Sequence, residues 1–318
     1  MTRYLKIFFS STLILVVLVQ FAAAYYFIRL MESSSEISDH RMYEIRSFPE
    51  SLRCGLVEYW IEKNLHHDGD ILILGDSQTF GFNARHDRIF SAELNRSNNV
   101  KGIAVKNASI VDGHFDDAQN VLRIVANQKI RLKTVIINVD PAHFKSEYHV
   151  LKHLPAYQCN KPNILSVIFT SDLLASMKIL AIQNFRNPSS SAPWLLRAED
   201  ADPLPPEIMN GPLPSDYITE INNEKYEVDF ISFLEAASTV AGRTIVYMSP
   251  TQLYKKLPEA QANIRKRYMG LCESFSARTG GVICLDPTSQ FDKKDFVDIV
   301  HLSSEGHRKL ATILDPSL

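Results

Sequence analysis

The stretch that decides the fold is Asp70-Ile-Leu-Ile-Leu-Gly-Asp-Ser-Gln-Thr79. Four consecutive apolar residues that end at a glycine are typical of a strand covered on both faces in a parallel sheet. A strand that passes directly into a turn and a helix exposes the Ser77 side chain beside backbone N–H groups. The stretch therefore predicts a parallel α/β fold with Ser77 at the carboxyl end of its first strand.

Four later stretches share the apolar character of the first strand. They predict further buried strands at Gly102–Asn107, Thr134–Asn138, Thr244–Met248 and Gly281–Leu285. Helical patterns separate most of them. This alternation indicates a three-layer, doubly wound, mostly parallel sheet of five strands with a flavodoxin-like arrangement.

A serine hydroxyl attacks an ester slowly unless a base removes its proton, and that base needs a carboxylate to orient it. The sequence supplies both near its end, in Asp298-Ile-Val-His301-Leu-Ser-Ser-Glu-Gly-His-Arg-Lys-Leu-Ala311. We expect Asp298 and His301 on a loop and a helix that begins near Ser303. Ser77, His301 and Asp298 are therefore the predicted catalytic nucleophile, base and orienting carboxylate.

The joint pattern of a strand, Gly75-Asp-Ser77 and a terminal Asp-x-x-His-Leu-Ser-x-x-Gly-His resembles the SGNH (GDSL-like) hydrolase superfamily. In that superfamily the first sequence block carries the nucleophile, and the last carries the aspartate and histidine. The resemblance covers residues 68–145 and 240–318 and implies a serine hydrolase or acyltransferase. A chance occurrence of the two short motifs is the competing interpretation.

The resemblance also implies three donors to the oxyanion that forms during acyl transfer. They are the N–H of the nucleophile, a backbone N–H in a second block and an asparagine side chain in a third. The corresponding residues are Ser77, Ser109 in Asn107-Ala-Ser-Ile-Val-Asp-Gly113 and Asn138 in Ile137-Asn-Val-Asp-Pro141. The third block departs from the family pattern Gly-x-Asn-Asp, so its donor is either shifted in register or missing.

Three residues near the nucleophile are candidates for the substrate pocket: Asp76, Phe80 and Asp140. For Asp76, a helix-capping or turn role is the stronger expectation. The histidines are scattered without the i, i+4 spacing of a metal site, so we expect no metal ion and no cofactor.

The first thirty residues predict attachment to a membrane. Residues 1–6 form a short cytoplasmic N-terminus, and residues 7–30 contain an uncharged run of about 22 residues, long enough to cross a bilayer as a helix. A cleaved signal peptide is the alternative, because Ala22–Ala24 offers a cleavage site. In either case the bulk of the chain is expected outside the cytoplasm, on the periplasmic side of a bacterial inner membrane.

The remainder divides into a stalk and one domain. Residues 31–50 are polar and typical of a stalk, and residues 51–318 form the predicted extracytoplasmic domain. Residues from about 145 to 235 interrupt the rhythm of strands and helices, which indicates a helical insertion. Placed after the third strand, it is either a cap over the carboxyl ends of the strands or a surface excursion unrelated to function.

Charge and cysteine content narrow the possible partners. The formal net charge is -2 and Lys and Arg form no stripe, so nucleic acid is not an expected partner.

Four cysteines permit up to two disulfides in an oxidising compartment. Cys272 and Cys284 are close enough to bridge a helix to the next strand, and four free thiols are the alternative.

An N-terminal anchor, the insertion and the altered third block resemble the membrane-anchored SGNH-like proteins of cell-surface polysaccharides. Relatives there include alginate O-acetylation proteins and the D-alanyl transfer protein of teichoic acid. The resemblance implies removal or transfer of acyl groups, acetyl above all, on an acylated glycan or a small ester, beside a multi-span membrane acyltransferase. A non-catalytic component that binds glycan or assembles such a complex is the alternative from another class.

Overall fold

The computed structural model describes residues 57–139 and 224–318, with gaps at 59, 66–68, 82–83, 85, 100–101, 110–112 and 253–257, and also residues 14, 15, 17 and 18. The predicted cytoplasmic N-terminus, the stalk, most of the predicted anchor and most of the predicted insertion lie outside the described residues. Among the described residues, no helix combines the length and the apolar character that crossing a bilayer requires.

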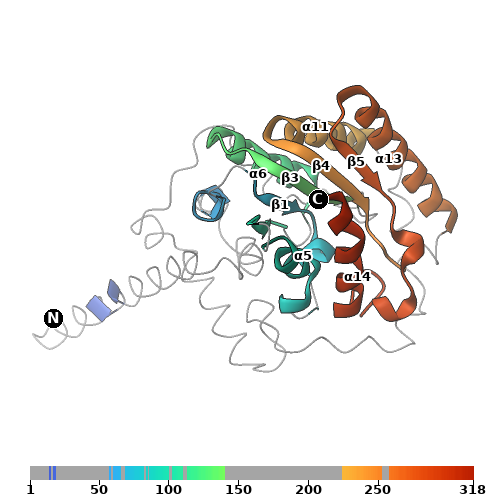
Figure 1. Cartoon of the computed structure of the whole chain (residues 1–318), viewed down its shortest axis with the longest axis horizontal. Helices are drawn as coiled ribbons and strands as arrows, with labels where there is room; N and C mark the ends of the chain where they lie inside the picture. The colour runs from blue at the N-terminus through green and yellow to red at the C-terminus, as the bar shows by residue number, and fades with distance from the viewer. Residues whose placement is uncertain are drawn as a thin grey trace, which may run out of the picture.

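A five-stranded parallel sheet forms the centre of the described structure (Figure 1). Its strands are β1 (Ile71–Leu74), β2 (Val105–Asn107), β3 (Leu132–Val139), β4 (Ala241–Met248) and β5 (Val282–Leu285). They lie in the order β2-β1-β3-β4-β5, and every neighbouring pair is parallel. The five predicted strands are confirmed, each within a few residues of its expected bounds.

Helices and short helical turns connect the strands. The α-helices are α4 (Ser77–Phe80), α5 (Phe90–Asn99), α6 (Phe115–Asn127), α11 (Glu224–Val240), α13 (Pro258–Thr279) and α14 (Ser304–Leu314). The 3-10 turns are η1 (His86–Arg88), η3 (Thr288–Gln290), η4 (Lys293–Asp295) and η5 (Asp315–Ser317). The helix predicted near Ser303 is α14, which Ser303 caps by accepting a hydrogen bond from the Gly306 N–H at 3.2 Å.

Side chains that alternate along β1 divide the core into two clusters, one on each face of the sheet. Leu72 and Leu74 pack with apolar residues of α6, α11 and α13, whereas Ile71 and Ile73 pack with those of α5 and α14. Figure 1 shows these two sets of helices on opposite sides of the sheet. The arrangement confirms the three layers expected of a doubly wound fold.

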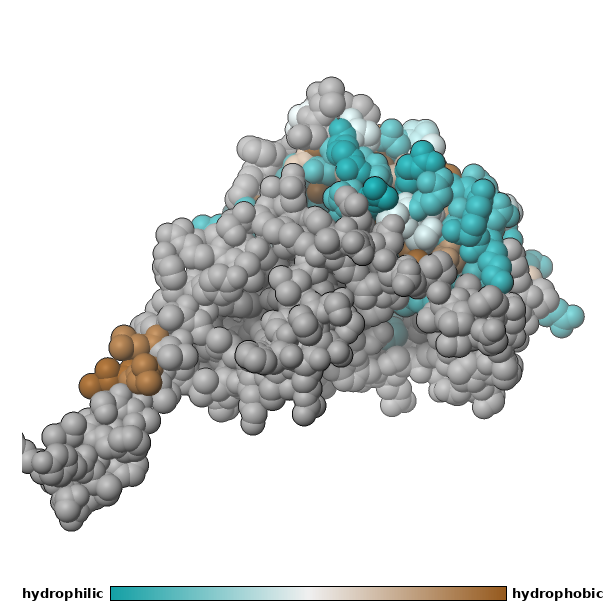
Figure 2. All heavy atoms as spheres, turned by 90° about the horizontal axis from the view of Figure 1, so that it is seen from below, coloured by the Kyte–Doolittle hydropathy of each residue, from teal (hydrophilic) through white to brown (hydrophobic). Residues whose placement is uncertain are grey.

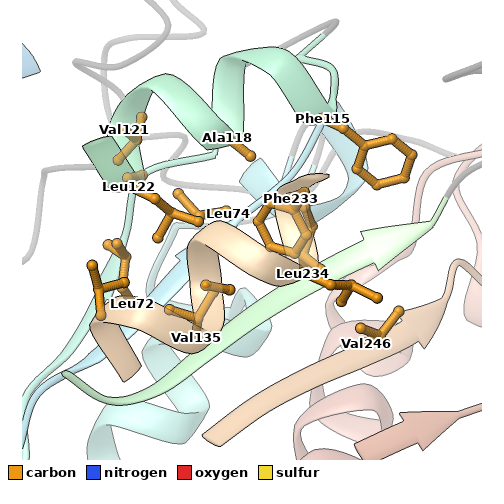
Figure 3. Close-up of a cluster of buried hydrophobic side chains, with 14 of the residues drawn as sticks. Leu72, Leu74, Phe115, Ala118, Val121, Leu122, Val135, Phe233, Leu234 and Val246 are labelled. Carbon is orange, nitrogen blue, oxygen red and sulfur yellow. The ribbon is translucent and has the colours of Figure 1, made fainter. Parts of the chain in front are cut away.

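The larger cluster docks α6 and α11 onto the middle of the sheet (Figure 3). The rings of Phe115 in α6 and Phe230 in α11 have centroids 5.1 Å apart, and both side chains are buried. Figure 3 shows residues of these helices packed over Leu74 and Val135 of the sheet. Burying a side chain of this size stabilises a fold by about 1.5–3 kcal/mol, so this cluster fixes the strands whose ends carry the candidate site.

Helix α11 overlaps the predicted end of the insertion. The sequence placed that end at about residue 235, but residues 224–235 belong to α11. Phe230, Phe233 and Leu234 are fully buried in the larger cluster, because they share the face of the helix that meets the core. The core fold therefore resumes at Glu224, before β4.

Cys272 of α13 and Cys284 of β5 form a disulfide, with their Cα atoms 6.1 Å apart. This bond joins a helix to the strand that follows it and confirms the pairing that the sequence spacing allowed. Cys54 and Cys159 lie outside the described residues. In the view of Figure 2, the surface of the described residues of the domain is largely hydrophilic.

Candidate active site

The turn between β1 and α4, here called the serine turn (residues 75–81), carries Ser77 at the carboxyl edge of the sheet. Gly75 has a φ of +144°, and a Cβ at this position would overlap Asn138 Oδ1 and the Thr79 side chain. Gly81 follows α4 in the left-handed region, with a φ of +87°. Because glycine alone adopts such conformations readily, these two residues confine Ser77 to the start of a single helical turn.

Asp76 caps that helical turn. Its Oδ1 accepts hydrogen bonds from the N–H groups of Gln78 at 2.9 Å and Thr79 at 3.4 Å, and from Asn138 Nδ2 at 2.9 Å. The residue is only 5% exposed. The expected capping role is confirmed. The place of Asp76 in the substrate pocket stays a prediction.

Asp298 and His301 lie on a loop between η4 and α14, here called the histidine loop (residues 297–302). The N–H groups of Val300 and His301 donate to Asp298 Oδ1 at 2.8 and 2.6 Å, and His301 Nδ1 lies 2.7 Å from Asp298 Oδ2. His301 Nε2 lies 3.0 Å from Ser77 Oγ. The three residues predicted from opposite ends of the chain therefore form one hydrogen-bonded series.

The neighbours of His301 determine how its ring is protonated. An ionised carboxylate only accepts hydrogen bonds, so Nδ1 donates to Asp298 and the lone pair of Nε2 faces Ser77 Oγ. Burial raises the pKa of Asp298, but hydrogen bonds from the His301 ring and from the His301 and Val300 N–H groups outweigh it and hold that pKa below its usual value. Asp298 is thus ionised at neutral pH and orients the ring.

The series remains accessible from solvent. The His301 and Asp298 side chains retain 18% and 15% of their exposure, and Ser77 is half-buried. Along the chain, β2 is placed on one side of β1, and β3, β4 and β5 follow on the other side. The direction in which strands are added therefore reverses at β1. In open α/β sheets, ligands bind at such a point, in the crevice outside the carboxyl ends of the strands.

Comparison with known proteins finds similarity in structure only. No protein-family model and no curated protein sequence matches the chain. Among solved structures, a carbohydrate esterase family 2 enzyme with a carbohydrate-binding domain from Corynascus thermopiles (Myceliophthora fergusii) is 11% identical over 79% of this chain, with a TM-score of 0.44. A member of the lipolytic protein G-D-S-L family from Veillonella parvula is 12% identical over 77% of this chain, also with a TM-score of 0.44.

A family two carbohydrate esterase from Clostridium thermocellum, solved in complex with cellohexaose, is 9% identical over 79% of this chain, with a TM-score of 0.42. The chain spans 65% and 63% of the lengths of the two carbohydrate esterases and 95% of the length of the G-D-S-L protein.

Asn138, a predicted oxyanion donor, makes its side-chain hydrogen bonds within the protein. Its Nδ2 donates to Asp76 Oδ1 at 2.9 Å and to Ser249 Oγ at 2.8 Å, while its Oδ1 accepts from the Asp76 N–H at 3.4 Å. The carboxylate on one side and the N–H on the other fix which end of the amide is nitrogen. Both amide hydrogens are used and the side chain is fully buried, so Asn138 braces the serine turn.

Ser109, the second predicted oxyanion donor, also makes a hydrogen bond within the protein through its backbone. Its N–H donates to Asn107 Oδ1 at 3.0 Å, in an Asx-type turn at the end of β2. Among the three predicted donors, this leaves the Ser77 N–H. As the first residue of α4, Ser77 has an N–H that no carbonyl of its own helix accepts.

For Phe80 and Asp140, the place in the substrate pocket stays a prediction. The Phe80 backbone belongs to α4, but its side chain lies outside the described residues, as does the whole of Asp140. Within the described part of the chain, no three His, Cys, Asp or Glu side chains are grouped so that they could hold a metal ion.

Sequence reasoning missed several residues that support the site, among them Asn107, Tyr247 and Gln78, whose Nε2 donates to the Val300 and Pro250 carbonyls. Asn107 Nδ2 donates to the Thr79 carbonyl at 3.0 Å, and the Tyr247 hydroxyl lies 3.0 Å from Thr79 Oγ1. Together with Asn138, the ends of β2, β3 and β4 therefore each contribute one polar side chain to the serine turn. Polar residues at the ends of apolar strands were the available signal, but the pattern does not reveal which of them meet.

Proposed function

We propose that this chain is an extracytoplasmic serine esterase or O-acyltransferase that acts on acyl groups, acetyl above all, of a cell-surface polysaccharide. The observation that carries the proposal is the series Ser77 Oγ, His301 Nε2, His301 Nδ1 and Asp298 Oδ2, with separations of 3.0 and 2.7 Å at its two contacts. Three polar groups brought together from distant parts of the chain, with the orienting carboxylate ionised, match the requirements of an activated nucleophile.

In the proposed reaction, Ser77 Oγ attacks the carbonyl carbon of an ester and His301 Nε2 takes the hydroxyl proton. Asp298 stabilises the imidazolium through Nδ1–H. The same Nε2–H then protonates the departing alcohol oxygen, leaving an acyl group on Ser77. Water or a sugar hydroxyl then gives a proton to His301 Nε2 and attacks this ester. His301 returns the proton to Ser77 Oγ as the acyl group leaves as the free acid or on the sugar.

Few hydrogen-bond donors are left to stabilise the oxyanion in this mechanism. The Ser77 N–H is not accepted by a carbonyl of its own helix, but the Ser109 N–H and the Asn138 amide are engaged within the protein. Losing one oxyanion donor costs about 10²–10³-fold in rate, so we expect slow turnover of simple esters. The same observation favours a second candidate function, a non-catalytic SGNH-like component that binds glycan or assembles a membrane acyltransferase complex.

The proposed location rests on the sequence of the anchor and on two structural observations. The Cys272–Cys284 disulfide is typical of an oxidising compartment such as the periplasm. The described residues of the predicted anchor, Ile14, Leu15, Val17 and Leu18, are helical and 39% to 61% exposed, as apolar side chains that meet lipid would be. The polysaccharide, the acetyl group and a multi-span acyltransferase partner are proposed from the resemblance in architecture alone.

The test is mass spectrometry of the whole chain in detergent after exposure to p-nitrophenyl acetate. We expect an acetyl adduct on Ser77 that is absent from Ser77→Ala. The matched control is Ser238→Ala, which removes an exposed serine of α11 and should leave the adduct unchanged. A folded protein that forms no adduct with several small esters would reject the esterase proposal and support the non-catalytic candidate.

A further inference from the structure

The histidine loop is closed by hydrogen bonds to its own backbone. Asp298 Oδ1 accepts from the Val300 and His301 N–H groups, and the His301 carbonyl accepts from the Val297 N–H at 3.0 Å. These bonds fix the shape of the loop and the position of His301 relative to Asp298. They do not fix the distance between the loop and Ser77.

That distance is set by contacts from outside the loop. Gln78 Nε2 donates to the Val300 carbonyl at 2.7 Å and to the Pro250 carbonyl at 2.7 Å. Next to this contact, the Gln252 N–H donates to the Ile299 carbonyl at 2.9 Å. The histidine loop is thus tied both to the segment after β4 and to the serine turn.

Gln78 is suited to this task by its place and by its amide. It is adjacent to Ser77 in sequence and only 1% exposed. Both of its neighbours are carbonyl oxygens, which only accept, so the amide nitrogen must lie between them and both of its hydrogens are used. The bond to Val300 is made one residue away from His301, so a shift of this contact moves the imidazole relative to the serine.

We propose that Gln78 is a positioning residue, which holds the histidine loop where His301 Nε2 reaches Ser77 Oγ. It acts through the Val300 carbonyl and touches neither the substrate nor the reacting atoms. The consequence for acyl transfer rests on the proposed function, whereas the placement of His301 is measurable without turnover. A displacement of a reacting group by about 1 Å can cost about 10²-fold in rate.

The test compares Gln78→Met with Gln119→Met, in the whole chain. Methionine keeps the length of the side chain and removes its donors. Gln119 provides a matched control, because it is also buried and its Nε2 donates to a backbone carbonyl, that of Asp229 at 3.0 Å, but it lies on α6 away from the serine turn. The first measurement is the rate of Ser77 acetylation by p-nitrophenyl acetate as a function of ester concentration and pH.

We expect Gln78→Met to lower the maximal acetylation rate about 10- to 100-fold, with little change in the ester concentration at half-saturation. Gln119→Met should acetylate like the unmodified chain. The second measurement is proton NMR of the downfield Nδ1–H of His301, assigned by its loss in His301→Ala. This signal should shift or broaden in Gln78→Met and stay in place in Gln119→Met.

The outcomes separate the two proposals. An unmodified chain that is never acetylated overturns the proposed function, and the NMR signal alone then decides the role of Gln78. A folded Gln78→Met with an unchanged signal and an unchanged acetylation rate overturns the positioning role. If Gln78→Met does not fold, Gln78→Leu replaces it, because leucine is also uncharged, is shorter than methionine and has no donor, and the same losses are expected.

Discussion

The serine turn and the histidine loop meet at one hydrogen bond but are held in different ways. The serine turn is braced by side chains from the ends of three strands, Asn107, Asn138 and Tyr247. The histidine loop is held by its own backbone, by Asp298 and by the two outside contacts at Val300 and Ile299.

This difference separates stability from chemistry. The braces of the serine turn are buried, so a change there leaves polar groups without partners in the core and lowers the free energy of unfolding. The Asp298 and His301 side chains are partly exposed, so a change there acts mainly on the proposed reaction.

Asp298→Asn should have the largest effect, on acyl transfer. The asparagine retains an oxygen for the Val300 and His301 N–H groups, but its NH₂ faces His301 Nδ1 and favours the wrong tautomer. We expect Ser77 acetylation to slow by about 10³–10⁴-fold. The free energy of unfolding in urea should change by less than about 1 kcal/mol. An unchanged acetylation rate would show that His301 needs no orienting carboxylate.

Gly75→Ala should have the largest effect on stability. The φ of +144° strains any other residue, and the added Cβ overlaps Asn138 Oδ1, so the brace must move. Strain and displacement together should lower the free energy of unfolding by about 2–5 kcal/mol in urea titrations.

Gly102→Ala is the control for this change. Its φ is +72°, but a Cβ there meets nothing within 4 Å, so only backbone strain of about 1 kcal/mol is expected. Equal losses in both variants would mean that the contact between Gly75 and Asn138 contributes nothing to stability.

The Cys272–Cys284 disulfide offers a third region in which stability should change without chemistry. β5 is one of the two edge strands of the described sheet, and β3 and β4 separate it from β1. The two cysteines are 12 residues apart, and closing a loop of that length contributes about 3 kcal/mol. The double variant Cys272→Ser with Cys284→Ser should lose about that amount in urea and acetylate at an unchanged rate below its unfolding transition. A slower acetylation would couple this edge to the site.

The elements of the fold could be predicted because each has a local signal. Continuous apolar runs predicted the strands, and the motifs around Ser77 and His301 predicted the three residues of the hydrogen-bonded series. The braces could not be predicted, because the contact between Asp76 and Asn138 joins residues 62 positions apart and depends on the register of β1 and β3. The contact between Gln78 and Val300 joins residues 222 positions apart.

Two of the predicted oxyanion donors show the same limit. The sequence resemblance predicted Ser109 and Asn138 near the nucleophile; Ser109 follows β2, and Asn138 lies near the end of β3. What sequence spacing cannot give is the direction of an N–H or an amide. In this fold, Asn107 turns to accept from Ser109, and Asp76 and Ser249 take both hydrogens of Asn138.

Lowering the pH should have the smallest effect on the free energy of unfolding. Comparison with Asp298→Asn restricts the test to the histidine loop. A carboxyl whose pKa is lower in the folded state stabilises the fold above its unfolded pKa of about 4, and this contribution is lost as the pH falls through the folded value. Asp298 has such a lowered pKa, so below about pH 5 the free energy of unfolding should fall more steeply in the unmodified chain than in Asp298→Asn.

Urea titrations at several pH values between about 5 and 2 measure the difference. Asp295 also has a lowered pKa, from its bond to Lys309 and despite its burial, but it is present in both proteins and cancels in the comparison. Parallel curves for the two proteins would mean that the bonds between Asp298 and the histidine loop add no stability. The shape of the loop would then not depend on Asp298, and the division between a serine turn braced by buried side chains and a histidine loop closed by Asp298 would be wrong.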